Sequence, residues 1–192
     1  NKTRCLFRES AKSRPLFFIA AVKRRTIEKR LPGHGTGGTR KKGRKTMFLN
    51  KRKIVLVGTG MVGMSFAYSA LNQAVCDELV LVDIDKKRAE GEAMDLNHGV
   101  AFASSSMRIY AGDYSDCSDA DLVVICAGVS QKPGESRLEL LQRNTAVFQS
   151  IISPITRSGF SGIFLVATNP VDIMTRVTYE LSGFNASRVF GT

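Results

Sequence analysis

The 192-residue sequence has few of the residues that bind metals or form covalent cross-links. Its only histidines are His34 and His98, so we expect no metal site. Its four cysteines, at positions 5, 76, 117 and 126, show no C-x-x-C spacing, which indicates reduced, structural thiols in a cytoplasmic protein. No apolar run approaches the roughly 20 residues that a membrane-spanning helix needs, so we expect no membrane segment.

Acidic residues are scarce in the first part of the chain. Residues 1–53 contain 18 of the 28 Lys and Arg residues but only 2 of the 17 acidic residues. Their formal charge is +16, whereas that of residues 54–192 is −5. The net charge of +11 therefore averages two unlike segments, and it does not describe a uniformly basic protein.

Residues 1–46 form a basic leader with a Gly-rich stretch and no repeat. Three interpretations remain open: a non-native leader, a disordered tail or transit peptide, and an arm that binds nucleic acid through its phosphates. We favour the first, because Met47 stands directly before a strand-like segment and is a credible initiator. The sequence thus predicts two parts, a leader at 1–46 that is disordered or non-native and a folded domain at 47–192.

Short apolar segments alternate with helical segments from Lys53 onward, and together they predict an α/β fold. The expected strands are 53–58, 78–85, 107–112, 121–128, 162–170 and a last one beginning in 187–192. The expected helices are 61–73, 86–99 ended by Gly99, 136–155 with its last turn loosened by Pro154, and 171–183 capped by Gly183. Continuously apolar strands with helices between them predict a doubly wound parallel sheet.

The long helix at 136–155 is expected to face the core with one stripe, formed by Leu141, Phe148, Ile151, Ile152 and Ile155.

A glycine-rich loop joins the first strand to the first helix. Gly58, Gly60 and Gly63 form the pattern G-x-G-x-x-G, which permits a tight turn, the approach of a pyrophosphate and close packing of helix on strand. Asp83 follows at the end of the second strand, where its carboxylate can bind a ribose diol and repel a 2′-phosphate. The pattern predicts a dinucleotide site that prefers NAD to NADP.

A polar loop follows the buried strand at 121–128. It carries Lys132, Glu135 and Arg137 around Pro133-Gly134, at the edge of the sheet where ligands bind in such folds. Arg137 could pair with a carbonyl or carboxylate of a substrate. The residues alone leave open a simpler interpretation, a solvated surface loop.

Four segments in order resemble the bacterial L-lactate dehydrogenases: VGTGMVG, LVDIDKKRAEGEAMDLNHG, DYSDCSDADLVVICAGVSQKPGESRLELLQRN and LVATNPVDIMT. The resemblance runs from about Lys53 to Thr192. It implies a Rossmann NAD-binding domain and the conversion of (S)-lactate and NAD⁺ to pyruvate and NADH, an oxidoreductase reaction of glycolysis and fermentation. It also implies a homo-oligomer, commonly a tetramer.

The resemblance also implies roles for individual residues. Arg137 would polarise the substrate ketone from a mobile loop, and Gln131 would favour pyruvate, because malate dehydrogenases have an arginine at that position. Asn169, next to a cis peptide bond with Pro170, would contact substrate and nicotinamide, with Pro170 and Asp172 lining the same turn. The residues implied around the cofactor are Gly58, Gly60, Val62, Gly63, Asp83, Arg88, Tyr114, Gly128, Val129, Ser150, Ala167, Thr168 and Asn169.

One part of the expected chemistry has no candidate in the sequence. Ketone reduction needs a proton donor that works near neutral pH, which is typically histidine, and the resemblance gives this role neither to His34 nor to His98. We therefore expect an N-terminal fragment of a lactate dehydrogenase that is inactive alone. The alternatives are a fragment of a malate or other 2-hydroxyacid dehydrogenase, and a non-catalytic dinucleotide-binding module with a basic nucleic-acid-binding arm.

Overall fold

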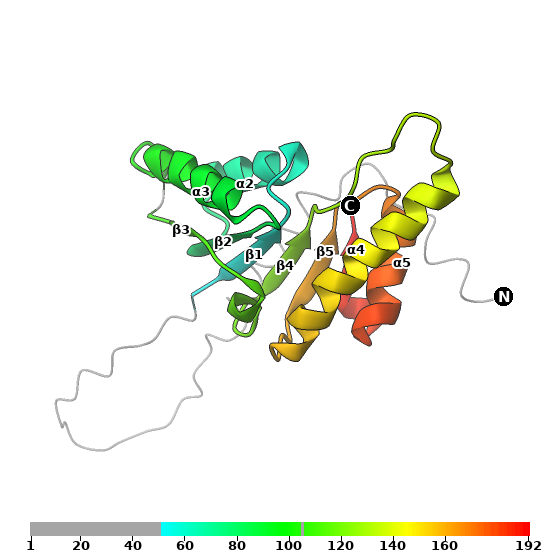
Figure 1. The fold of residues 1–192 in the computed structure, drawn as a ribbon. Coiled ribbons are helices and arrows are strands. Elements are labelled where there is room, and N and C mark those ends of the chain that lie inside the picture. Colours follow the sequence, from blue (N-terminus) through cyan, green and yellow to red (C-terminus); the bar gives the residue numbers. More distant parts are fainter. Residues whose placement is uncertain (1–50, 105) are drawn as a thin grey trace, which may run out of the picture. The chain divides into compact units, whose positions relative to one another are not determined.

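The computed structural model describes residues 51–104 and 106–192 (Figure 1). The predicted leader at 1–46 and Met47 lie outside the described residues. The strands are β1 (Lys53–Val57), β2 (Glu78–Val82), β3 (Arg108–Ala111), β4 (Leu122–Ile125), β5 (Ile163–Val166) and β6 (Val189–Gly191). The helices are α2 (Met61–Gln73), α3 (Lys86–Val100), α4 (Arg137–Arg157) and α5 (Val171–Ser182), with short 3₁₀ turns η1 (Tyr114–Cys117) and η2 (Ala186–Arg188).

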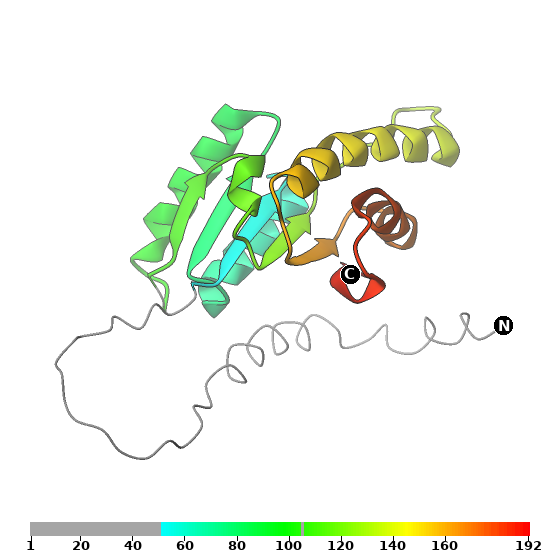
Figure 2. The same cartoon turned by 90° about the horizontal axis from the view of Figure 1, so that it is seen from below.

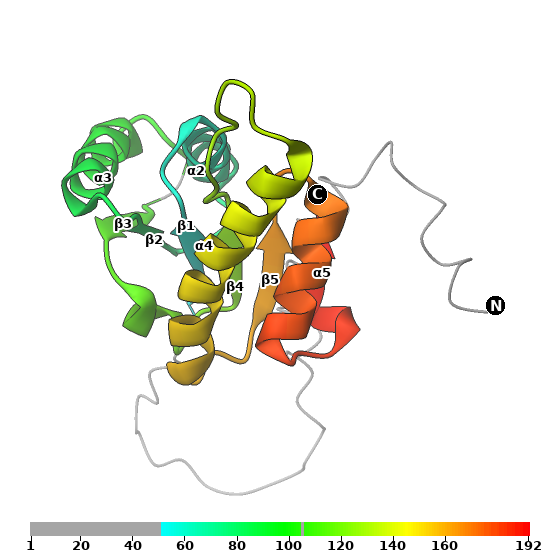
Figure 3. The same cartoon turned by 45° about the vertical axis from the view of Figure 1, so that its right-hand side comes forward.

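All neighbouring strands of the sheet are parallel, in the order β3-β2-β1-β4-β5-β6. Helices α2 and α3 lie together on one face, and α4 and α5 lie together on the other (Figures 1 and 3). Figure 2 shows the α4–α5 pair beside β4 and β5 from another direction. The chain order reverses between β1 and β4, so the predicted doubly wound α/β sheet is confirmed, with its topological switch at these two strands.

The core consists of the two faces of these central strands. All five residues of β1 and all four of β4 are buried, as expected for strands covered by helices on both sides. On the α4 side, the buried Phe148, Ile151, Ile152 and Ile155 pack in the same cluster as alternate residues of β1 and β4, and Leu141 is partly buried against it. The predicted stripe of the long helix is therefore confirmed.

The ends of the helices show which local signals were sufficient. Gly183 ends α5 with a left-handed φ of 65°, as predicted. Gly99 does not end α3, and that prediction was wrong: the helix continues to Val100, and Ala101 follows it in right-handed conformation. Helix α4 likewise continues past Pro154 to Arg157. A glycine or proline near a helix end therefore marks the end only approximately.

Candidate dinucleotide and substrate site

The loop between β1 and α2 can be built only with glycine at two positions. Gly58 has a φ of +98°, and a Cβ there would lie 2.5 Å from the backbone nitrogen of Ala127, at the end of β4. A Cβ on Gly63 would collide with the carbonyl oxygen of Gly58, so helix α2 packs directly on the turn. These contacts confirm the sequence-based reasons for the first and third glycines of the motif.

Gly60 is different, because a Cβ there would meet nothing within 4 Å. It is the N-cap of α2, and no side chain caps that helix end. The adjacent Met61 and Val62 are exposed. An uncapped helix N-terminus behind an open glycine favours an anion such as a pyrophosphate. The residues present therefore fit a dinucleotide.

Asp83, at the end of β2, is bound to the same loop. Its Oδ2 accepts hydrogen bonds from the N–H (2.7 Å) and the hydroxyl (2.9 Å) of the buried Thr59, and its Oδ1 accepts one from the N–H of Asp85 (3.0 Å). Burial acts to raise the pKa of Asp83, but the hydrogen bonds from Thr59 and Asp85 outweigh it, so the pKa lies below its usual value. The carboxylate is therefore charged at neutral pH and retains lone pairs for a ribose.

A pocket of about 220 Å³ adjoins this carboxylate. It is lined by Asp83, Lys86, Ala89, Glu90, Ala111, Gly112 and Asp113. Tyr114 begins η1 directly after this pocket, and its pKa is raised by burial and then by the nearby Cys117 and Asp83. Arg88 lies in the first turn of α3, with its guanidinium exposed and 3.9 Å from the carboxylate of Glu92. The ends of β2 and β3 thus present a polar hollow beside the glycine loop.

The ends of β4 and β5 fit closely together. A Cβ on Gly128 would lie 2.7 Å from the Cγ2 of Thr168, and the hydroxyl of Thr168 donates to the carbonyl of Ala127 (2.8 Å). Asn144 of α4, with only 1% of its surface exposed, accepts a hydrogen bond from the N–H of Val129 (2.9 Å). Sequence reasoning missed Asn144, because a polar residue within a helix carries no periodic signal of a contact with a loop.

Asn169 and Pro170 follow β5 and are joined by a cis peptide bond, as predicted. Pro170 is the N-cap of α5, and Asp172 lies exposed in the first turn of that helix. Ala167 precedes this turn and donates its N–H to the carbonyl of Ile125 (2.9 Å). The turn is therefore tied to β4, next to Gly128 and Val129.

Arg137 is the first residue of α4, and it is exposed. The resemblance implied a loop position, but the capping box formed by Ser136 and Glu139 begins the helix at Arg137 itself. Gln131 lies exposed in the preceding loop, where its amide donates to the carbonyl of Glu135 (2.7 Å). Ser150 is exposed further along α4, and its hydroxyl donates to the carbonyl of Val147. The structure therefore gives Ser150 a partner within its own helix.

His98, in the last turn of α3, is exposed. Over residues 51–104 and 106–192, no group of three or more His, Cys, Asp or Glu side chains could hold a metal ion. Within the same ranges, no helix has the length and apolar character needed to cross a membrane.

The fold and the glycine loop together define a Rossmann dinucleotide-binding domain, with a polar loop after β4. Residues 52–191 match the family model of the lactate/malate dehydrogenase NAD-binding domain. The chain belongs to this family, and its cofactor is NAD.

Comparisons with known proteins agree. An L-lactate dehydrogenase from Geobacillus sp. (strain WCH70) is 56% identical over 140 residues, which are 73% of this chain and 44% of that protein. L-lactate dehydrogenase 2 from Bacillus cereus is 57% identical over the same length, which is 45% of that protein. The chain thus spans less than half the length of the curated relatives it matches.

Solved structures give the same result. A lactate dehydrogenase from a Medee basin deep-sea metagenome is 58% identical, with a TM-score of 0.72 over 73% of this chain and 45% of that one. The minor L-lactate dehydrogenase from Enterococcus mundtii, in its ligand-bound form, is 49% identical, with a TM-score of 0.73 over 74% and 45%.

Proposed function

We propose that this domain is the NAD-binding part of an L-lactate dehydrogenase that interconverts pyruvate and (S)-lactate. The observation that carries the proposal is the segment after β4, in which Gln131 of the loop and Arg137 at the start of α4 follow the same sheet edge as the glycine loop. The relatives are named L-lactate dehydrogenases. They are more than twice as long as the matched region, so the activity belongs to a polypeptide that also supplies the remaining half.

The cofactor, when bound, supplies or accepts the hydride. The turn at Gly58, Gly60 and Gly63 would hold its pyrophosphate, assisted by Val62. Asp83 would bind a ribose, and its negative charge would repel the 2′-phosphate of NADP. Arg88, Tyr114, Gly128, Val129, Ser150, Ala167 and Thr168 are proposed to complete the cofactor site.

At the substrate, Arg137 would hold the ketone oxygen and stabilise the negative charge that develops there, because its guanidinium is always charged and donates in a fixed plane. Gln131 is neutral, so it would accept the methyl group of pyruvate and give no partner to the second carboxylate of oxaloacetate. Asn169, Pro170 and Asp172 would line the other side, after β5. We further propose a cytoplasmic homotetramer, as the family resemblance implies.

The test is a chimera in which residues 51–192 are joined to the second half of the Geobacillus relative. Arg137→Gln should lower kcat/KM for pyruvate by about 10²-fold or more, as does loss of one donor to a developing oxyanion. Gln131→Arg should move the preference toward oxaloacetate.

Arg176→Ala is the matched control. Within the part of the chain that the structure describes, the side chain of this exposed arginine of α5 forms an ion pair with Glu180 and lies over the ring of Tyr179. Unchanged kinetics in Arg137→Gln would overturn the catalytic assignment. An unchanged substrate preference in Gln131→Arg would overturn the lactate specificity.

A further inference from the structure

Glu135 organises the loop between β4 and α4. The N–H of Glu135 donates to the carbonyl of Lys132 (3.1 Å) across Pro133 and Gly134, and the φ of +77° at Gly134 gives this segment the pattern of a type II turn. The Glu135 carboxylate then accepts the N–H of Lys132 (2.8 Å) through Oε2. The turn is thus closed twice, once by backbone and once by side chain.

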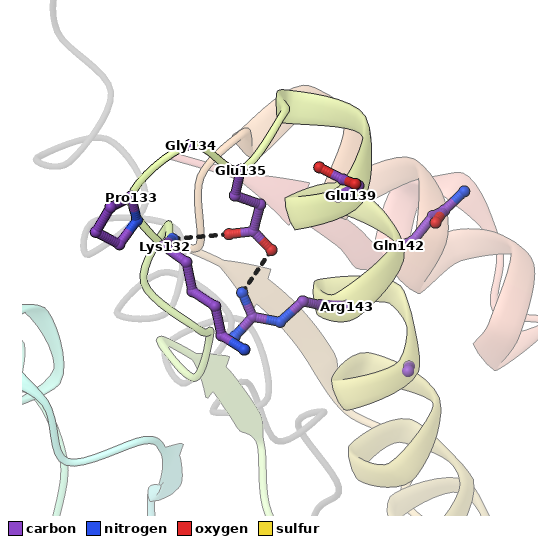
Figure 4. Close-up of a pocket in the computed structure, with 8 residues that line it drawn as sticks. Lys132, Pro133, Gly134, Glu135, Glu139, Gln142 and Arg143 are labelled. Atoms are coloured by element: carbon purple, nitrogen blue, oxygen red, sulfur yellow. Dashed lines mark hydrogen bonds and ion pairs between the residues drawn. The ribbon is translucent and has the colours of Figure 1, made fainter.

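The same carboxylate connects the turn to helix α4. Its Oε1 accepts a hydrogen bond from the guanidinium of Arg143 (2.6 Å), so the carboxylate lies between the Lys132 backbone and the arginine (Figure 4). The side chain of Glu135 is only 8% exposed, whereas that of Arg143 is 35% exposed. These hydrogen bonds, from Lys132 first and then from Arg143, hold the pKa of Glu135 below its usual range.

Arg143 and Asn144 are consecutive residues of α4, and each binds one end of the loop between β4 and α4. Asn144 binds the N–H of Val129, where the chain leaves β4, and Arg143 binds Glu135, just before the chain enters α4. The segment between these anchors contains Gln131, whose amide is in turn held by the carbonyl of Glu135. The turn at Lys132, the amide of Gln131 and the ion pair of Arg143 therefore all involve Glu135, and Asn144 binds the other end of the loop.

We propose that Arg143 is a positioning residue for substrate recognition: through Glu135 it fixes the turn that places Gln131, while Asn144 fixes the other end of the loop. The inference rests on the proposed function for its role in catalysis, because it concerns the site of Gln131 and Arg137. A single surface ion pair usually contributes little. Here the Glu135 carboxylate also closes the turn through the N–H of Lys132, so the loss of Arg143 affects the whole segment.

The first test needs no catalysis and uses the 192-residue chain. Amide hydrogen exchange would be measured for Lys132 and Glu135 in the wild type, Arg143→Ala, Glu135→Gln and the control Arg176→Ala. Arg143→Ala should accelerate exchange of both amides by roughly tenfold, the loss expected for one hydrogen bond between charged groups. Exchange in β1 and β4 should not change.

Glu135→Gln keeps an acceptor for the N–H of Lys132 but removes the charge that pairs with Arg143. Because the charged acceptor of the Lys132 N–H is lost together with the ion pair, Glu135→Gln should accelerate exchange at Lys132 at least as much as Arg143→Ala does. Equal exchange in the wild type and Arg143→Ala, with an intact sheet, would overturn the proposal even if NAD binding and activity are as proposed.

The second test uses the chimera and separates positioning from general stability. Arg143→Ala should raise KM for pyruvate by about fivefold, because part of the binding energy must then order the loop, and should change kcat by less than about twofold. Arg143→Lys, which keeps the charge, should restore part of the affinity. An unchanged or lower KM would show that the pair does not position the loop for substrate.

Discussion

The two edges of the sheet differ in how their polar groups are satisfied. At the amino edge, where β1, β2 and β3 begin, charged side chains bind one another. The buried Lys53 donates to Asp119 (2.7 Å) and lies 3.6 Å from Asp116, and Arg52 donates to Asp77. At the carboxyl edge, the strands end in glycines, an uncapped helix N-terminus and exposed side chains. The charged groups of the first edge satisfy one another, whereas the second edge leaves backbone and side-chain groups open to ligands.

Tyr110 illustrates the amino edge. Its hydroxyl lies 2.8 Å from the carboxylate of Glu78 and 3.0 Å from that of Asp116, and Arg108 lies over its ring. These groups come from three separate parts of the chain and satisfy one another without a ligand. At the carboxyl edge, Asp83 is also held by hydrogen bonds, but its partner Thr59 belongs to the glycine loop itself. Mutations at the two edges should therefore have separable effects on stability and binding.

The largest effect is expected at Gly63. Gly63→Ala places a methyl group against the Gly58 carbonyl, which is backbone and cannot rotate away. We expect a loss of about 3 kcal/mol in the free energy of unfolding, the upper end of the range for overpacking, and the loss of NADH binding. Thermal unfolding by circular dichroism and NADH fluorescence would measure the two.

Gly60→Ala sharpens this comparison. Because the space around Gly60 is open, its stability should change by no more than about 0.5 kcal/mol, while NADH affinity falls. Gly91 of α3 also has open space around it, and Gly91→Ala should leave NADH binding unchanged. Equal stability of the Gly63 and Gly60 variants would contradict the steric account.

The next effect concerns Asp83. Asp83→Asn removes the negative charge but keeps one acceptor oxygen for Thr59, so the ratio of NADH to NADPH affinity should fall by about tenfold, a single charge interaction near 1.4 kcal/mol. Because the pKa of Asp83 is lowered, its carboxylate should stay charged between pH 5 and 8, so a change in the wild-type ratio over that range would come from the 2′-phosphate of NADPH, whose second pKa is about 6. The stability that comes from the charged form is fully present above the unfolded-state pKa of Asp83 and is lost as the pH falls through its lower folded-state pKa. Fluorescence titrations with both cofactors would detect a change.

The smallest of these effects is expected at Tyr110. Tyr110→Phe removes the hydroxyl shared by Glu78 and Asp116, and should cost about 1 kcal/mol in stability with no change in NADH affinity. Burial, followed by the hydrogen bonds to Glu78 and Asp116, raises the pKa of Tyr110 above its usual value. The contribution of the neutral phenol is thus complete below the unfolded-state pKa and is lost as the pH rises through the folded-state pKa. Urea unfolding at pH 8 and above would measure both the loss of stability in Tyr110→Phe and its dependence on pH. Weaker NADH binding by this variant would show that the two edges of the sheet are coupled.

The sequence was sufficient for the elements and for much of the carboxyl edge. The doubly wound parallel sheet, the glycine loop, the stripe of α4 and the cis bond before Pro170 follow from periodicity, from glycine geometry and from the resemblance. The hydrogen bonds from the Val129 N–H to Asn144, from Arg143 to Glu135 and from Lys53 to Asp119 were not predicted. Each joins residues from separate segments of the chain, and these partners are set by the helix rotation and strand register of the folded chain.

The central position of β1 in the sheet also affects how the domain folds. This strand pairs with β2 on one side and, on the other, with β4, which the chain reaches only after two helices and β3. The turn at Gly58 packs closely against Ala127, which follows β4. Its shape therefore depends on a segment that is distant in the sequence. Such long-range pairing forms slowly, because the chain loses the entropy of closing the loop before the contacts between the strands stabilise it. During synthesis on a ribosome, the glycine loop is made before β4, so it can take its final shape only after β4 has been added.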